Sequence, residues 1–256
     1  MPPSVKLSQV GIQPGNRQYI DEPAIARNYD ASLVDNLVAK FDEAIVEKKL
    51  AELSKSNPSA VVADFGCGTG RSLLTAKRAG FCCIGIDLSP SMLEIAADKM
   101  VAEPSSAVYQ LFKSNLLELD WMQRESIDLA LCMFSTFGMI HGRTNRISFL
   151  QTVKNSLTPK GKLLVHGHNV WYQRFFPGGK SWLARSWIRS FFQRSFEFGG
   201  RYADNRFVEQ LFLHSFTLAG MKHELAAAGF VIENIFPIRD EKQTSTPVGW
   251  IVECRK

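Results

Sequence analysis

Short apolar runs alternate with amphipathic helical stretches through most of this 256-residue chain. Runs that predict strands are residues 60–65, 81–87, 108–113, 127–134, 162–168, 230–237 and 249–254. Helical spacing is present at residues 31–53, 71–78, 90–101, 144–157 and 217–228. Strands that alternate with helices at this spacing form a parallel sheet covered by helices on both faces. The sequence therefore predicts an α/β fold.

The composition allows a full hydrophobic core, because 45% of the residues are hydrophobic. Five cysteines form an odd set without a CxxC pair, so we expect reduced thiols and no metal site. Residues 1–23 lack the apolar region of a secretory signal. The apolar stretch 127–140 contains Asp128 and is shorter than the ~20 residues of a membrane helix. We therefore expect a cytoplasmic protein.

The strongest local signal is a glycine-rich segment, Asp64-Phe65-Gly66-Cys67-Gly68-Thr69-Gly70, where a predicted strand turns into a predicted helix. Glycines at such a turn let the backbone approach a ligand that lies across the strand ends. A loop that binds the pyrophosphate of a dinucleotide has glycine or alanine at the position of Arg71. Asp64 would also repel a phosphate, whereas it suits a ligand with an ammonium or sulfonium group. These residues argue against a nicotinamide cofactor.

Asp87 ends the next predicted strand. In related nucleotide-binding folds a carboxylate at this point accepts hydrogen bonds from both hydroxyls of a ribose. Ser89 and Pro90 follow as an N-cap and a helix-starting proline, which hold the strand end in place. A plain turn or capping role is the alternative for Asp87. The neighbouring glycine loop favours the ribose.

Three segments together resemble the class I S-adenosylmethionine-dependent methyltransferases: residues 64–70, 85–93 and 157–162. The resemblance runs from about Tyr29 to Lys256. It implies a Rossmann-like fold with a seven-stranded, mostly parallel sheet, an antiparallel C-terminal strand, and S-adenosylmethionine as the cofactor.

The resemblance also implies how the chain is organised and which residues hold the cofactor. Residues 1–28 would be an N-terminal extension and residues 29–256 the methyltransferase domain, with a helical cap insertion at about 170–208. Asp64 and the backbone of the glycine loop would hold the methionine portion, and Asp87 the ribose. The expected cofactor-binding residues are Tyr29, Asp64, Gly66, Cys67, Gly68, Gly70, Asp87, Leu88, Asn115, Leu116 and Met133. Leu88 would pack on the adenine, and Asn115 would accept a hydrogen bond from its amino group.

Methyl transfer from a sulfonium is an in-line displacement, so a protein mainly has to hold the nucleophile and the methyl group close together and dry. Acceptor-binding residues are expected after the fourth and fifth predicted strands. These candidates are Ser135, Thr136, His141, His168 and Asn169. His214 joins them because it resembles a histidine that precedes a helix in several relatives. A purely structural hydrogen bond is the alternative role of each histidine.

Basic charge gathers between the fifth predicted strand and the following helix. From His168 to Arg206 there are seven basic and two acidic residues, and 7 − 2 = +5 equals the net charge of the whole chain. In a helical projection of residues 181–196, six apolar side chains lie on one arc: Leu183, Ala184, Trp187, Ile188, Phe191 and Phe192.

Three interpretations of the basic segment, residues 171–206, stay open. It could be a lid that buries Trp187 and Phe191 beside the methyl donor and so binds substrate, a helix on an anionic membrane, or a basic aromatic platform for RNA. A resemblance of the region around Leu213 and His214 to tRNA wobble-uridine methyltransferases favours RNA. The balanced charge of the remaining chain opposes it.

The sequence therefore predicts an S-adenosylmethionine-dependent methyltransferase with a small-molecule acceptor. The alternatives are an RNA-modifying methyltransferase and a non-catalytic S-adenosylmethionine-binding subunit. An oxidoreductase is disfavoured by Arg71. Neither the accepting atom nor an oligomeric state follows from the sequence.

Overall fold

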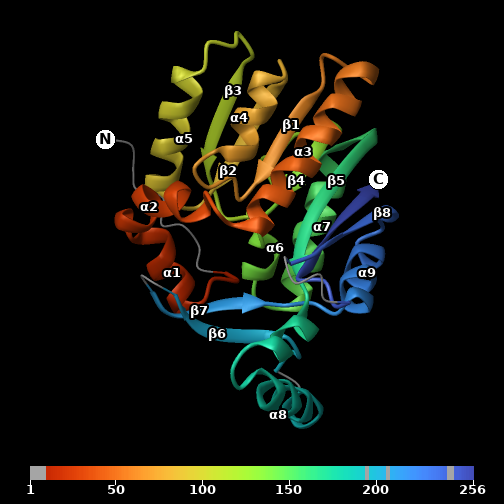
Figure 1. The fold of residues 1–256 in the computed structure, drawn as a ribbon. Coiled ribbons are helices and arrows are strands. Elements are labelled where there is room, and N and C mark those ends of the chain that lie inside the picture. Colours follow the sequence, from red (N-terminus) through yellow and green to blue (C-terminus); the bar gives the residue numbers. More distant parts are fainter. Residues whose placement is uncertain (1–9, 194–195, 206–207, 241–244) are drawn as a thin grey trace.

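A seven-stranded sheet forms the centre of the molecule (Figure 1). The computed structural model describes residues 10–193, 196–205, 208–240 and 245–256. The strand order is β3-β2-β1-β4-β5-β9-β8. The strands are β1 (Val61–Phe65), β2 (Cys82–Asp87), β3 (Tyr109–Lys113), β4 (Ile127–Cys132), β5 (Leu157–His168), β8 (Val231–Ile238) and β9 (Gly249–Arg255). Neighbours from β3 to β5 are parallel, and β9 is antiparallel to β5 and β8. The mostly parallel sheet with an antiparallel C-terminal strand is confirmed.

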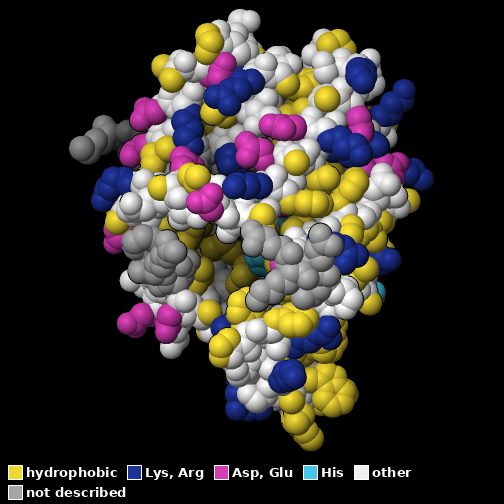
Figure 2. All heavy atoms as spheres, in the orientation of Figure 1, with side chains coloured by type: hydrophobic (Ala, Val, Ile, Leu, Met, Phe, Trp, Pro, Cys, Tyr) yellow, Lys and Arg dark blue, Asp and Glu magenta, His cyan; other side chains and the backbone are white. Residues whose placement is uncertain are grey.

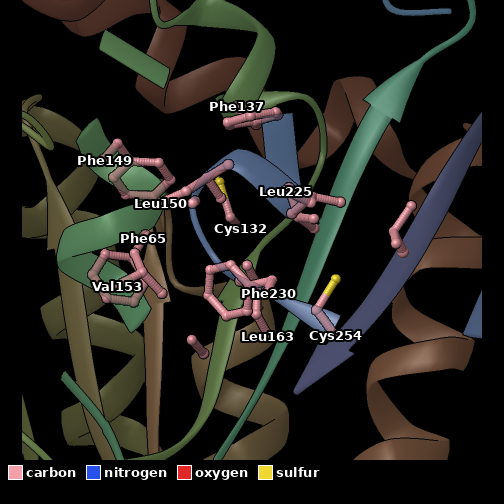
Figure 3. Close-up of a cluster of buried hydrophobic side chains, with 14 of the residues drawn as sticks. Phe65, Cys132, Phe137, Phe149, Leu150, Val153, Leu163, Leu225, Phe230 and Cys254 are labelled. Carbon is pink, nitrogen blue, oxygen red and sulfur yellow. The ribbon is translucent and has the colours of Figure 1, made fainter. Parts of the chain in front are cut away.

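Helices cover both faces of this sheet (Figure 1). One face carries α3 (Leu37–Ser56), α4 (Arg71–Arg78) and α5 (Pro90–Ala102), and the other carries α7 (Arg143–Ser156) and α9 (Leu218–Ala227). Figure 3 shows the core beneath α7 and α9, where side chains such as Phe65, Phe149 and Leu225 meet. Burial of these two apolar layers is the main stabilising contribution to such a fold.

The predicted helix at residues 31–53 is two helices, α2 (Pro23–Leu33) and α3. The break comes at Asn36, whose side chain accepts a hydrogen bond from the Ala39 amide and so caps α3. The sequence did not predict this break, because the helical spacing of apolar residues continues across it. Strand β5 begins at Leu157, five residues before the predicted strand at residues 162–168, and its pairing with β4 shifts register between Leu157 and Lys162.

Several elements of the structure were not predicted from the sequence. They are α1 (Pro14–Asp21), α6 (Thr136–Met139), the 3-10 helix η1 (Val170–Phe175) and a hairpin of β6 (Gly200–Asn205) and β7 (Val208–His214). The hairpin crosses the carboxyl end of the parallel strands, and α1 packs against β7 (Figure 1). Asn16 fixes this packing, because its side chain accepts from the Phe212 amide at 2.8 Å and donates to the Phe212 carbonyl at 3.0 Å.

Helix α8 (Gly179–Phe192) lies at the far end of the molecule, beyond the hairpin (Figure 1). Its main neighbour is η1. Within the described residues no helix has the length and apolarity to cross a membrane. Arg194 and Arg206, two of the seven basic residues of this region, lie outside the described part of the chain, as do residues 1–9.

Candidate active site

A cavity of about 280 Å³ opens at the carboxyl end of the parallel strands. This is the edge at which open α/β sheets bind their ligands. The residues predicted for the cofactor or the acceptor that line it are Tyr29, Gly66, Gly68, Asp87, Leu88, Asn115, Leu116, Ser135, Thr136 and His168. The fold thus brings together side chains from six separate stretches of the sequence.

The glycine loop after β1 forms the floor of the cavity. Gly66, Gly68 and Gly70 have φ angles of 81°, 53° and 78°, which side-chain-bearing residues rarely adopt. A Cβ added at Gly66 would lie 2.2 Å from the Thr136 side chain, so this glycine permits close contact with α6. At Gly68 the nearest atom to such a Cβ is in Tyr29, 3.9 Å away, so the loop is open toward the cavity there.

Two carboxyl groups lie at the ends of β1 and β2: Asp64 is buried, and Asp87 is half-buried at the cavity. Burial, followed by the nearby charge of Asp87, raises the pKa of Asp64 to about 7, against an opposing effect of Arg71. Among the described residues no Lys or Arg forms a salt bridge with Asp64. Burial also raises the pKa of Asp87, although the amides of Ser89 and Gly68 oppose this shift. Two neighbouring acidic groups that form no salt bridge among the described residues suit a ligand that brings a positive charge.

Tyr29 and Asp30 connect α2 to the glycine loop. The Tyr29 ring lines the cavity next to Gly68. Asp30 accepts a hydrogen bond of 2.6 Å from the Thr69 hydroxyl and pairs with the Lys99 ammonium at 2.5 Å. Helix α2 therefore orders the loop over which a ligand would lie.

The end of the cavity nearest β3 is formed by Leu88, Asn115 and Leu116. The Asn115 side chain accepts from the Leu117 amide at 3.1 Å and donates to the Val10 carbonyl at 3.1 Å. Both polar ends of Asn115 are therefore engaged with backbone. A hydrogen bond to an adenine amino group would use the second lone pair of its carbonyl oxygen.

The backbone after β4 is held in a strained conformation at the cavity wall. Phe134 and Ser135 have φ angles of 45° and 72°. Asp42 of α3 supports this turn, because its Oδ2 accepts from the Phe134 amide at 2.9 Å. The same oxygen lies 2.9 Å from Nδ1 of His166 in β5. One buried carboxylate thus ties α3, the turn after β4 and β5 together.

His168 is the predicted histidine that reaches the cavity. Its ring contacts the ring of His166, with 5.0 Å between the centroids. Burial, followed by the neighbouring His166, lowers the pKa of His168 to about 3. The imidazole is therefore neutral at physiological pH, and it can accept or donate one hydrogen bond at the cavity.

Several predicted site residues are absent from the lining of the cavity. They are Asp64, Cys67, Gly70, Met133, His141, Asn169, Trp187, Phe191 and His214. Asn169 instead caps η1 through the Trp171 amide and donates to the Pro247 carbonyl. His141 packs against the Phe212 ring, 4.8 Å away between centroids.

His214 belongs to a buried ion-pair cluster behind the cavity. Glu197, His214 and Glu224 lie close enough together to hold a metal ion. The Arg146 guanidinium, however, forms two hydrogen bonds of 2.8 Å with Glu224 and a short one with Glu197. An arginine paired with both carboxylates accounts for this cluster without a metal ion.

The lid interpretation of Trp187 and Phe191 is wrong. Their side chains are 53% and 67% exposed on α8 instead of buried beside the cavity. The helix turns Ser186, Leu183 and Trp182 inward, and Ser186 is buried. The rule that the apolar arc of a helix faces the core failed here because α8 packs mainly on η1.

Sequence reasoning missed the opposite wall of the cavity. Residues 10–12, Asn16, Tyr19 and Ile20 line it from the N-terminal extension, and Leu211 and Leu213 line it from β7. The short apolar run Leu211-Phe212-Leu213 could have indicated a strand. Nothing local could have indicated that α1 would close over the site, because that contact is made across 196 residues of sequence.

The sheet order, the glycine loop after β1 and the acidic residue after β2 together define a Rossmann-like fold of the methyltransferase kind. Residues 62–161 match the family described as "Methyltransferase domain". This part of the chain is therefore similar to a methyltransferase domain, and the chain shares the fold of solved S-adenosylmethionine-dependent methyltransferases.

Several known proteins with a similar sequence or fold are named methyltransferases. Demethylmenaquinone methyltransferase of Tropheryma whipplei (strain Twist) is 30% identical over 142 residues, 55% of this chain and 54% of the relative. The chain spans 30% to 54% of the length of the first curated relatives that it matches.

Two solved structures share the fold across almost the whole chain. The CcbJ methyltransferase from Streptomyces caelestis has a TM-score of 0.66 at 15% identity and covers 93% of this chain and 97% of its own. The Burkholderia thailandensis 1,6-didemethyltoxoflavin-N1-methyltransferase, with bound 1,6-didemethyltoxoflavin and S-adenosylhomocysteine, has a TM-score of 0.56 at 19% identity over 91% of this chain and 87% of that protein.

Proposed function

We propose that this protein transfers the methyl group of S-adenosylmethionine to a small, largely apolar acceptor in the cavity. The observation that carries the proposal is a pair of carboxyl groups, the buried Asp64 and the half-buried Asp87, on either side of an open glycine loop. A phosphate-bearing dinucleotide would be repelled there, whereas a cationic amino acid joined to a ribose is attracted. The cofactor in the Burkholderia structure is of this chemical kind, since S-adenosylhomocysteine is the demethylated product.

The residues present fit this cofactor. Asp87 would accept hydrogen bonds from the ribose hydroxyls, while the Gly68 and Ser89 amides keep its carboxylate oriented. Leu88 and Leu116 would enclose the adenine. Asp64 lies beneath the loop and would favour the ammonium group by its charge. When bound, the cofactor supplies an electrophilic methyl group on a sulfonium sulfur.

The acceptor would occupy the other half of the cavity. The apolar side chains of Ile12, Met139, Leu211 and Leu213 line the cavity together with the ionisable His168. A neutral His168 would orient the acceptor nucleophile, and the covering α1 and β7 would exclude water. The demethylmenaquinone and toxoflavin enzymes named above likewise act on small molecules according to their names.

We also propose that the reaction takes place in the cytoplasm. All five cysteines are free thiols, and four of them are buried. Free thiols without a disulfide framework are typical of reducing compartments.

Calorimetric titration with S-adenosylmethionine, S-adenosylhomocysteine and NAD tests the cofactor. We expect both sulfur compounds to bind and NAD not to bind. Methyl transfer from labelled cofactor to apolar small-molecule fractions then tests catalysis. Tight binding with no transfer to any fraction would favour a non-catalytic binding subunit, and binding of NAD in place of the sulfur compounds would contradict the proposal.

A further inference from the structure

Helix α8 presents an apolar surface to the solvent. Trp187, Ile188, Phe191 and Phe192 are 53%, 51%, 67% and 84% exposed. The Trp187 and Phe191 rings pack edge to face on each other, 4.7 Å apart between centroids. Contiguous exposed apolar surface of this kind marks an interaction site more often than a free surface.

Three more exposed apolar side chains lie on η1 and in the turn that joins η1 to α8. Trp171, Phe175 and Phe176 are 44%, 48% and 50% exposed. Seven of the 15 large hydrophobic side chains that are exposed in the described part of the chain therefore belong to residues 171–192. Figure 2 shows the resulting protrusion, with hydrophobic side chains at its tip beside dark blue basic ones. We call this surface the α8 patch.

The charged residues of the segment that carries the α8 patch are all basic, and one acidic residue from outside it, Asp240, accepts a hydrogen bond of 2.8 Å from the Tyr172 hydroxyl of η1. Residues 170–193 contain four basic residues, Arg174, Lys180, Arg185 and Arg189, and no Asp or Glu. All four are exposed. On the helix, Arg185 and Arg189 are one turn apart and flank the apolar arc. Helices with Trp and Phe on one arc and Arg or Lys beside it lie in the interface of anionic membranes.

Other occupants fit the patch less well. A second copy docked helix to helix would find no acidic residue between Val170 and Gln193 to pair with these arginines. Single-stranded RNA binds through rings on which bases stack. The aliphatic Ile188 lies within the arc, and the Trp187 ring is already packed on Phe191. Acyl chains need no such stacking geometry.

We propose that the α8 patch docks this protein on the surface of an anionic lipid bilayer. The apolar tip inserts among the acyl chains near the headgroups, and the basic side chains contact the lipid phosphates. Docking of this kind is peripheral, because α8 has 14 residues and does not span a bilayer.

Sedimentation of the full chain with vesicles tests the proposal. One vesicle type is phosphatidylcholine, and the other contains equal parts of phosphatidylcholine and phosphatidylglycerol. We expect binding to the mixed vesicles only, and weaker binding when salt rises from about 0.1 M to about 1 M. The double variant Phe191→Ser/Phe192→Ser should bind at least about tenfold more weakly, because it lacks two rings that would be buried in the bilayer on docking.

A matched control is Val101→Ser/Val108→Ser, which removes two side chains that are 74% and 63% exposed elsewhere. Its vesicle binding should equal that of the unchanged protein. The proposal is overturned if the chain ignores mixed vesicles, or if the α8 double variant still binds them fully. Shifting of an RNA oligonucleotide, or dimerisation in ultracentrifugation, without vesicle binding would also overturn it. None of these measurements requires S-adenosylmethionine, so they are independent of the proposed function.

Discussion

The Asp87 carboxylate accepts a hydrogen bond of 2.8 Å from the backbone amide of Gly68. This bond joins the end of β2 to the glycine loop after β1, so the two halves of the proposed cofactor site form one unit. Ser89 donates a second bond, of 2.9 Å, to the other carboxylate oxygen. A loop and a strand end that are connected in this way are preorganised for a ligand.

Replacing Asp87 with alanine should weaken S-adenosylmethionine binding by about 1–3 kcal/mol, the usual result when a charged hydrogen-bond partner is removed. Calorimetric titration measures the change. Asp98→Ala is the control, because Asp98 is exposed on α5, and it should leave affinity unchanged. Equal affinity of the Asp87 variant and the unchanged protein would mean that the ribose lies elsewhere.

Affinity for S-adenosylmethionine should rise with pH. The pKa of Asp64 is raised to about 7 by burial and by the charge of Asp87, so its carboxyl group is largely protonated at lower pH. A cationic ligand favours the carboxylate, and affinity therefore increases as the pH rises through that value, roughly five- to tenfold between about pH 6 and about pH 7.5. Titrations at several pH values measure this slope. Asp64→Asn should abolish the slope, and a flat profile of the unchanged protein would contradict the assignment.

His168 should stay neutral across the physiological pH range. Its pKa is lowered to about 3 by burial and by His166, so protonation disfavours the folded state. His168 accordingly destabilises the fold as the pH falls below its unfolded value of about 6.5, and it has no effect above that value. NMR titration of the imidazole signals measures its charge, with His168→Asn identifying the resonance. A midpoint near neutrality would show that this ring is hydrated and charged.

Asn16→Ala should destabilise the protein by about 1–3 kcal/mol, because the Phe212 amide and carbonyl lose their partner in a buried contact. Chemical denaturation measures the loss, and proteolysis within α1 should become faster. Asn28→Ala is the matched control, since its side chain bonds only within α2 and is exposed. A variant as stable as the control would indicate that α1 is not fixed through Asn16.

Arg146→Met should cost about 3–5 kcal/mol of stability, because it leaves the fully buried Glu224 with only the exposed Arg143, 3.5 Å away, as a partner. The double variant Arg146→Met/Glu224→Met should recover much of this loss. Denaturant unfolding compares both with Arg143→Met, whose side chain is 54% exposed and should matter little. Unfolding is also measured with a metal chelator. Unchanged stability would contradict a bound metal ion at Glu197, His214 and Glu224.

The sequence by itself determined the parallel sheet, the glycine loop and the carboxylate after β2. Each of these rests on a local signal. A strand of five or six residues has its own apolar pattern, and a turn that needs positive φ angles selects glycine at Gly66 and Gly68. Ser89 and Pro90 likewise start α5 through contacts within a few residues.

The tertiary structure alone decided which residues cover the site and which face outward. Asn16 meets Phe212, and Asp42 meets His166, across 196 and 124 residues, and no local pattern encodes such pairings. The same holds for α8. Its apolar arc predicted burial, but the helix packs mainly on the short η1, and Phe192 stays exposed. Periodicity specifies that a helix has an apolar side. Only the packing of the whole chain specifies whether core, cofactor or another surface covers that side.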